Sequence, residues 1–219
     1  MQHFPIPRTR VNRVDCILAA CQGRRVLHLG AADHPYTDMR LRNGDWLHSK
    51  ITAAASHCLG IELDPAIVAR LAAAHSITNL RVGNAERLGE LDLGQWDVVV
   101  AGEIIEHLNC PGDMFAGVAK LLAPGGEFVI STTNAYCLRR CLRLVVGTES
   151  IHPDHVAFYS HRTLAALAER YGFTAARVMN YSMEDRRHRL PWLFDRLASL
   201  MVPSWGEGII HAYRLSGPQ

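Results

Sequence analysis

Residues 26–35 read VLHLGAADHP, an aliphatic run that stops at a single glycine. Val26–Leu29 has the composition of a buried strand, and the small residues after Gly30 let the backbone approach a ligand closely. Ligand-binding turns of this kind usually carry more than one glycine. The stretch therefore predicts a strand that runs into a binding turn, and the elements that follow it decide the fold.

Strand-like and helix-like segments alternate along the chain. Predicted strands cover 25–30, 58–63, 80–85, 96–102, 127–132, 174–183 and 208–215, and predicted helices cover 13–23, 45–56, 64–76, 113–126, 161–173 and 191–201. The helix at 64–76 has a good start, because Asp64 can cap it and Pro65 suits its first position. This alternation predicts an α/β fold with a doubly wound, mostly parallel, seven-stranded Rossmann-like sheet and helices on both faces. The longer segment before the last strand leaves that strand free to run antiparallel.

Length and composition are those of one domain with a sizeable core. The chain has 219 residues, 48% apolar, with a formal net charge of +2, which is too mild to indicate nucleic acid by itself. Its six cysteines form no Cys-x-x-Cys pair. The start lacks the apolar core of a signal peptide and no run is long enough for a membrane span, so we expect a cytoplasmic protein. Residues 1–219 are treated as one domain, with 1–14 as an N-terminal extension and 34–50 and 181–206 as lid or acceptor-binding segments.

Four predicted strand ends carry residues that suit one ligand. Glu62 stands about thirty residues after Gly30, where a carboxylate can accept both hydroxyls of a ribose. Asn84, in GNAERL, offers an amide to an adenine edge, although asparagine is also common in turns. The fourth end lies in WDVVVAGEIIEHL, residues 96–108, which is the most distinctive stretch of the chain. Because ligands bind outside the carboxyl ends of the strands in such sheets, we expect these ends to form one site.

The order of these pieces resembles the class I S-adenosylmethionine-dependent methyltransferase superfamily. The resemblance spans roughly residues 15–215 and rests on VLHLGAAD, GIELDP, NAERL, WDVVVAGEIIEHL and LLAPGGEFVISTTN. It is strongest with the small-molecule O-methyltransferases of the quinone-biosynthesis type. It implies S-adenosylmethionine as the cofactor and a single methyltransferase domain.

The resemblance also implies a set of cofactor-binding residues. The turn after the first strand would hold the methionine end of the cofactor, and the tip of the second strand would bind its ribose and pack on its adenine. The tip of the third strand would face the adenine amino group. The end of the fourth strand would line the floor of the site near the sulfonium. These residues are Gly30, Ala31, Ala32, Asp33, Glu62, Leu63, Asn84, Ala85, Ala101 and Gly102. The chain departs from the family where it has His28 in place of an acid, and Ala32 and His34 in place of glycines. These departures keep open the alternative of a non-catalytic, methyltransferase-like partner subunit.

The fourth strand end also suggests a metal site. Glu103, Glu106 and His107 stand at i, i+3 and i+4, so they project from one face if EIIEHL begins a helix. Two carboxylates and an imidazole suit a divalent cation such as magnesium, manganese, iron(II) or zinc, with His155 or His152 as a fourth ligand. The set resembles the metal-binding residues of quinone-pathway O-methyltransferases and of terminal-ribose 2′-O-methyltransferases of small RNAs. In related methyltransferases without a metal, the histidine lines the pocket and the acid favours the helix dipole.

These features lead to one expected function and its alternatives. We expect O-methylation of a small hydroxylated acceptor, such as a sugar, a phenol or catechol, or a natural-product intermediate, with carbon and nitrogen acceptors left open. His107 and His155 are the candidate general bases if they do not bind a metal, because histidine titrates near neutral pH. The alternative is a terminal-ribose 2′-O-methyltransferase of RNA, although no basic groove supports nucleic acid as a partner. Met183, Trp192 and Phe194 are candidates for an acceptor wall, with core packing as the competing interpretation. The oligomeric state cannot be read from the sequence.

Overall fold

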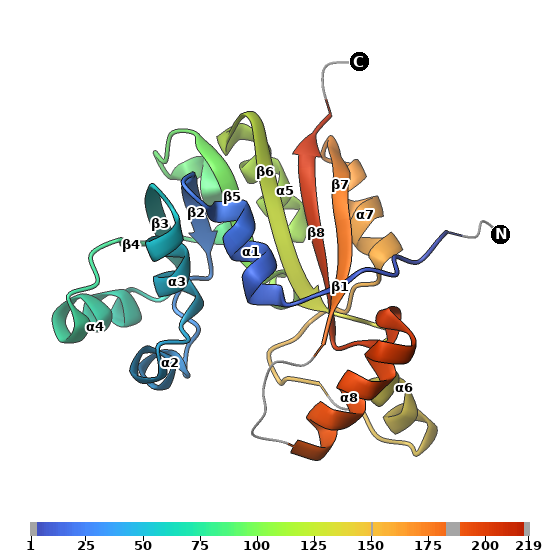
Figure 1. Cartoon of the computed structure of the whole chain (residues 1–219). Coiled ribbons are helices and arrows are strands. Elements are labelled where there is room, and N and C mark those ends of the chain that lie inside the picture. Colours follow the sequence, from blue (N-terminus) through green and yellow to red (C-terminus); the bar gives the residue numbers. More distant parts are fainter. Residues whose placement is uncertain (1–3, 150, 183–188, 217–219) are drawn as a thin grey trace.

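The molecule is built around one twisted sheet (Figure 1). The structure is a computed structural model, and it describes residues 4–149, 151–182 and 189–216. The sheet has the strand order β1-β7-β8-β6-β5-β2-β3-β4. Its strands are β1 (Arg10–Val11), β2 (Arg25–Leu29), β3 (His57–Glu62), β4 (Leu80–Val82), β5 (Trp96–Gly102), β6 (Leu122–Thr133), β7 (Phe173–Tyr181) and β8 (Gly208–Leu215). Only β8 is antiparallel to its neighbours, β6 and β7. The predicted doubly wound α/β fold is therefore confirmed, with its last strand antiparallel.

The predicted number of seven strands is one too few. The eighth strand, β1, comes from the N-terminal extension and pairs with the end of β7, with Arg10 opposite Asn180 and Val11 opposite Tyr181. A two-residue strand has no alternation that a sequence can display, and only the pairing with β7 defines it.

Helices cover both faces of the sheet. They are α1 (Arg13–Cys21), α2 (Thr37–Asn43), α3 (Leu47–Ala54), α4 (Pro65–His75), α5 (Pro111–Leu121), α6 (Leu138–Val145), α7 (His161–Glu169) and α8 (Arg189–Met201), with 3-10 turns η1 (Ala85–Glu90), η2 (Ile105–His107) and η3 (Pro203–Trp205). In Figure 1, α1 and α3 lie on one face and α5 and α7 on the other, while α2, α6 and α8 lie beyond the carboxyl ends of the parallel strands. The sequence patterns did not predict α6, and for residues 35–51, which contain α2, they left a lid and an extended helix as alternatives.

The core has two layers because the central strands are covered on both faces. On β5, Val99 and Ala101 face the α5 and α7 layer, whereas Val98 and Val100 face the α1 and α3 layer. All four side chains are fully buried. This explains why the strand reads as a continuous apolar run rather than an alternating one.

Strand order and register bring the four predicted ligand-binding ends into one row. The order β5-β2-β3-β4 makes their carboxyl ends neighbours, and the register sets Leu29 of β2 opposite Ala101 of β5. The start of α4 at the β3 tip is capped as predicted, since the Asp64 carboxylate accepts the Ala66 N–H at 2.7 Å. Among the described residues, no helix combines the length and apolar character needed to cross a bilayer.

Candidate cofactor and acceptor site

The turn after β2 is tightly held and uses two residues with positive φ. Gly30 has φ +67° and Asp33 has φ +58°, whereas Ala31 and Ala32 stay outside the left-handed region. Asparagine and aspartate are the side chains that tolerate this region best after glycine, so the missing family glycines do not prevent a tight turn. The Gly30 and Ala31 N–H groups both donate to the Ile61 carbonyl, at 2.9 and 3.2 Å. The turn is thereby attached to β3.

Side chains of residues 34–50 donate hydrogen bonds to the backbone of this turn. The Thr37 hydroxyl donates to the Ala32 carbonyl at 2.5 Å, and the Trp46 indole N–H donates to the Ala31 carbonyl at 3.0 Å. Both side chains are buried. Neither was predicted as a site residue, because a lone Thr or Trp in an inserted segment has no pattern that marks it. The predicted lid role of this segment stays a prediction.

His28, which stands where the resembling family has an acid, is paired with a second histidine. Its Nδ1 lies 3.2 Å from Nδ1 of His48 on α3, and the two rings stack with centroids 5.4 Å apart. Burial lowers the pKa of His48 to about 4, and burial together with His48 lowers the pKa of His28 well below its usual value. The pair is therefore neutral, with one ring donating and the other accepting. The chain replaces a buried charge beneath the turn with two neutral imidazoles.

Glu62 links the tips of β2 and β3. Its Oε2 accepts the Ala32 N–H at 3.1 Å, and its Oε1 accepts the Leu63 and Asp64 N–H groups at 2.9 and 3.3 Å. Three N–H donors fix the carboxylate while the side chain stays half-buried at the edge of the site. A carboxylate has about four lone-pair positions, so one stays open for a ribose hydroxyl, and the long 3.3 Å contact from the Asp64 N–H can give way to the second hydroxyl. The neighbouring Leu63 side chain is 66% exposed and can cover one face of a planar base.

The other two strand ends complete the row. The Asn84 side-chain oxygen accepts the Glu86 N–H at 2.8 Å and so caps η1, while Ala85 is buried behind it. Gly102 ends β5 next to buried Ala101, and a Cβ there would lie in ordinary contact with Leu47, at 3.4 Å. The ten predicted cofactor residues thus occupy adjacent strand ends, and their roles toward a cofactor stay predictions.

The segment after β5 does not begin the helix that the sequence suggested. Glu103 has φ +54°, and its N–H donates to the Ser131 carbonyl, so the chain turns away before a single 3-10 turn, Ile105–His107. The Tyr181 hydroxyl donates to Glu103 Oε1 at 2.6 Å, and the Thr132 hydroxyl donates to Glu106 Oε2 at 2.9 Å. The prediction that both carboxylates and His107 share one helix face is wrong, because left-handed backbone at Glu103 breaks the helical spacing.

The two glutamates therefore have different environments. Glu106 is fully buried, and its Oε1 has no hydrogen-bond partner among the described residues. Burial, and then the nearby Glu103 charge, raise the pKa of Glu106 to about 8. Geometry separates the two carboxylates from His107: among the described residues, their oxygens and the His107 nitrogens do not form one group of ligand atoms within 4.8 Å of one another.

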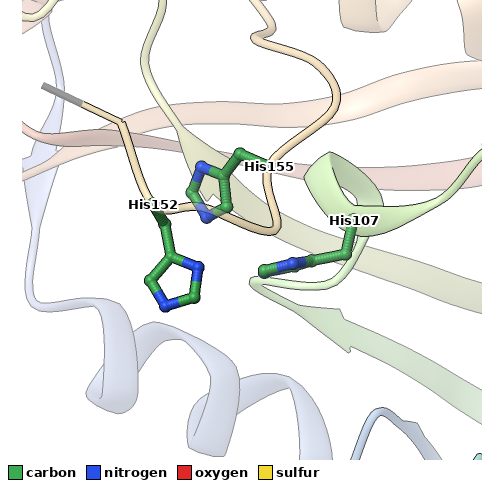
Figure 2. Close-up of side chains that lie close together, drawn as sticks. All are labelled: His107, His152 and His155. Carbon is green, nitrogen blue, oxygen red and sulfur yellow. The ribbon is translucent and has the colours of Figure 1, made fainter. Parts of the chain in front are cut away.

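Three histidines come together instead, as Figure 2 shows. The ligand nitrogens of His107, on η2, and of His152 and His155, on the loop after α6, lie within 4.8 Å of one another. The His107 and His155 ring centres are 4.6 Å apart with the planes perpendicular. Burial, followed by the neighbouring His107 and His152, lowers the pKa of His155 to about 4, and burial also lowers the pKa of His107. The cluster unites His107 and His155 as predicted, with His152 as the third member.

A cavity of about 670 Å³ lies on the α7 side of the carboxyl end of β6. Its walls come from residues 4–7, α6, α7, β8 and η3, and they include Asn134, Ala165 and Trp205. His161 and His211 also line it, and His161 Nδ1 lies 2.8 Å from His211 Nε2. The cavity is mostly apolar with a few fixed polar groups, which is the character of a small-molecule site. Of the predicted acceptor wall, Trp192 and Phe194 are not among the cavity-lining residues, and Met183 lies outside the described residues.

Comparison with known protein families gives one match over most of the chain. The model of a family described as a methyltransferase domain matches residues 15–178. Among curated proteins, the ubiquinone biosynthesis O-methyltransferase of Aromatoleum aromaticum is 29% identical over 175 residues, covering 75% of this chain and 70% of that protein. The enzyme of the same name from Aeromonas salmonicida is 27% identical over 161 residues, covering 68% of this chain and 63% of that protein. Two other curated relatives are longer than this chain, which spans only 53% and 52% of their length.

Solved structures agree on the fold. The magnesium protoporphyrin IX methyltransferase from Synechocystis, solved with bound S-adenosylhomocysteine, superposes with a TM-score of 0.60 at 14% identity. That superposition covers 93% of this chain and 82% of that one.

Proposed function

The chain belongs to the methyltransferase-domain family and is an S-adenosylmethionine-dependent methyltransferase, and on this premise we propose that it methylates a hydroxyl oxygen of a small molecule. The proposal is carried by the position of His107 and His155. His107 lies on η2, directly after β5, whose end, Gly102, belongs to the row of predicted cofactor-binding strand tips, and the His155 ring, from the loop after α6, packs against it. A hydroxyl acceptor needs its proton removed as the new bond forms, and an imidazole is suited to accept it. Of the two, His107 is the better candidate, because burial lowers the pKa of His155 to about 4.

The chemistry can be assigned atom by atom. The bound cofactor supplies a methyl group on a sulfonium: the new O–C bond forms as the C–S bond breaks, and the sulfur leaves as a neutral thioether. The turn after β2 and the Glu62 carboxylate would hold the cofactor, and positioning of the two reactants is the main contribution that an enzyme makes to such a displacement. The acceptor proton passes to an imidazole nitrogen. His107 Nδ1 lies 3.2 Å from the Asp154 carbonyl, which holds the proton on Nδ1 and leaves the Nε2 lone pair to receive another.

Two observations favour a small acceptor over RNA. The cavity of about 670 Å³ has room for one small molecule, and its walls are mostly apolar, although its lining includes neither the histidine cluster nor the predicted cofactor residues. The net charge of +2 gives no general attraction for a polyanion. The curated relatives named ubiquinone biosynthesis O-methyltransferases support phenols and catechols as the first acceptors to test. Within the proposal, residues 34–50 support the cofactor turn, and residues 181–206 contribute Ser204 and Trp205 to the acceptor side.

The test is a transfer assay with S-adenosylmethionine that carries a deuterated methyl group. The purified protein is incubated with phenols and catechols, with sugars, and with an RNA oligonucleotide that has a free terminal ribose, and products are identified by mass spectrometry. We expect a deuterated methyl ether on a phenol or catechol. Replacing the base, His107→Gln or His155→Gln, should lower kcat by about 10²–10⁴-fold in at least one of the two variants.

The matched control is His57→Gln, which removes an exposed histidine on β3 that stacks on Trp96, away from the cluster. It should leave kcat unchanged. Methylation of RNA alone, or of nitrogen or carbon alone, would contradict the proposal. So would unchanged kcat in both cluster variants.

A further inference from the structure

We propose that His107, His152 and His155 form a binding site for a borderline transition-metal ion, with Zn²⁺ as the type case, in place of a carboxylate site for Mg²⁺. The three side chains converge from two segments, with their ligand nitrogens within 4.8 Å of one another (Figure 2). The inference rests on the geometry of the cluster and not on the methyl-transfer reaction. A bound ion would take the lone pairs of His107 and His155, so neither histidine would act as the base while the metal is present.

The hydrogen bonds around the cluster leave nitrogen lone pairs available to bind a metal ion. The Asp154 carbonyl orients the His107 ring through Nδ1 at 3.2 Å, as outer hydrogen bonds do in metal sites, so Nε2 carries the free lone pair. His155 Nδ1 is buried and has no hydrogen-bond partner among the described residues. Such an atom is costly unless something satisfies it, and a metal ion would do so. The Asp154 N–H reaches His152 Nδ1 only at 3.3 Å, a weak contact that a metal bond can replace.

The backbone holds the two segments together before any ion binds. The Val156 and Ala157 N–H groups donate to the Glu106 carbonyl at 2.8 and 3.3 Å, which fixes the loop next to η2. Within the loop, the His155 N–H donates to the His152 carbonyl at 3.0 Å. Tetrahedral zinc with Zn–N bonds of about 2.0–2.1 Å needs nitrogens about 3.3 Å apart. The His152 side chain is 47% exposed, so it is free to rotate inward by the remaining distance.

The donor set decides which ion the cluster would prefer. Glu106 is buried against Thr132, and Glu103 accepts from Tyr181, so neither carboxylate belongs to the cluster. Imidazole ligands suit zinc, copper and nickel, whereas magnesium needs oxygen ligands. Three protein ligands leave a coordination position open, as in zinc sites that bind a substrate oxygen.

The test measures metal binding without any acceptor. Protein without a polyhistidine tag is treated with EDTA, dialysed, and titrated by calorimetry with Zn²⁺, Co²⁺ or Mg²⁺. Metal content is measured on the same samples, and the visible absorption of Co²⁺ reports nitrogen coordination. We expect stoichiometric binding of Zn²⁺ and Co²⁺ and none of Mg²⁺ at the same concentration. His152→Ala and His155→Ala should each weaken Zn²⁺ binding by at least about tenfold.

Two controls separate this site from its competitors. His57→Ala should retain wild-type Zn²⁺ affinity, and so should Glu103→Gln, which removes a carboxylate of the other candidate set. Lack of Zn²⁺ binding by the wild type would overturn the proposal, as would binding that survives both histidine variants. A loss in Glu103→Gln equal to the loss in His152→Ala would also overturn it, in favour of the carboxylate site. Because no acceptor is present, failure of the proposed O-methylation would leave these results unaffected.

Discussion

The buried pair of His28 and His48 predicts a specific loss of stability in mild acid. The His48 side chain is 1% exposed, and burial lowers its pKa from 6.5 to about 4, against smaller opposing contributions from Asn79. Between pH 6.5 and 4, the unfolded chain binds a proton at His48 that the folded protein does not bind. Stability attributable to this group is therefore complete above about pH 6.5 and falls as the pH drops toward 4. At pH 5, the two pKa values give a roughly thirtyfold shift toward unfolding, or about 2 kcal/mol.

The assay is urea denaturation at pH 7 and pH 5 for the wild type and for His48→Gln. The variant loses packing at both pH values, but its change in stability between them should be about 2 kcal/mol smaller than that of the wild type. The control is Ile51→Val, a fully buried neighbour on α3 that should cost about 0.5–1.5 kcal/mol at both pH values and keep the wild-type pH dependence. If His48→Gln and the wild type lose the same stability between pH 7 and pH 5, the reasoning from burial is refuted.

Two further predictions concern the cofactor turn and the cavity. Gly30→Ala should destabilise the protein by at least about 1–2 kcal/mol in urea denaturation, because φ is +67° and an added Cβ would lie 2.8 Å from the Ile104 side chain. The control, Gly94→Ala, has φ +65° but open space around it and should therefore lose less stability. Equal losses of stability in the two variants would contradict the close contact with Ile104. Ala165→Phe should fill part of the cavity and raise the acceptor KM without changing the affinity for S-adenosylhomocysteine. The control, Ala166→Phe, changes the next residue of α7, which does not line the cavity, and should leave the acceptor KM unchanged. Equal KM values in the two variants would exclude the cavity as the acceptor site.

The row of strand ends could be predicted because each end carries a local signal. The apolar runs before Gly30, Glu62 and Gly102 mark buried strands, and the polar or small residue after each run marks its end. In a parallel sheet these ends must share one edge, so the sequence was sufficient to collect them into one site. The cap of α4 at Asp64 was equally local, since Asp-Pro carries its own start signal.

The metal candidates could not be predicted correctly because they depend on one backbone conformation. Glu103 adopts left-handed φ, and a glutamate gives no sign of this in a sequence, whereas a glycine would have done so. The spacing Glu-x-x-Glu-His therefore suggested a helix that does not form. His152 was named only as an alternative ligand, because its closeness to His107 depends on long-range hydrogen bonds from Val156 to Glu106.

The support around the cofactor turn is also invisible in the sequence. Thr37 and Trp46 reach the turn from an inserted segment that contains α2, a short helix with no clear periodicity. Tertiary contacts, and not local propensity, place such residues.

The central claim is that the strand ends of β2 and β3 bind the cofactor through Glu62. The most direct measurement is calorimetric titration of the purified protein with S-adenosylhomocysteine, repeated on Glu62→Ala and on Glu90→Ala, whose side chain is 68% exposed on η1. Hydrogen bonds to a charged group are worth about 1.5–3 kcal/mol each, so losing two of them should weaken binding by at least about 100-fold. The account predicts micromolar binding by the wild type and by Glu90→Ala, and loss of that binding in Glu62→Ala. Absence of binding by the wild type, or unchanged affinity in a folded Glu62→Ala variant, would contradict it.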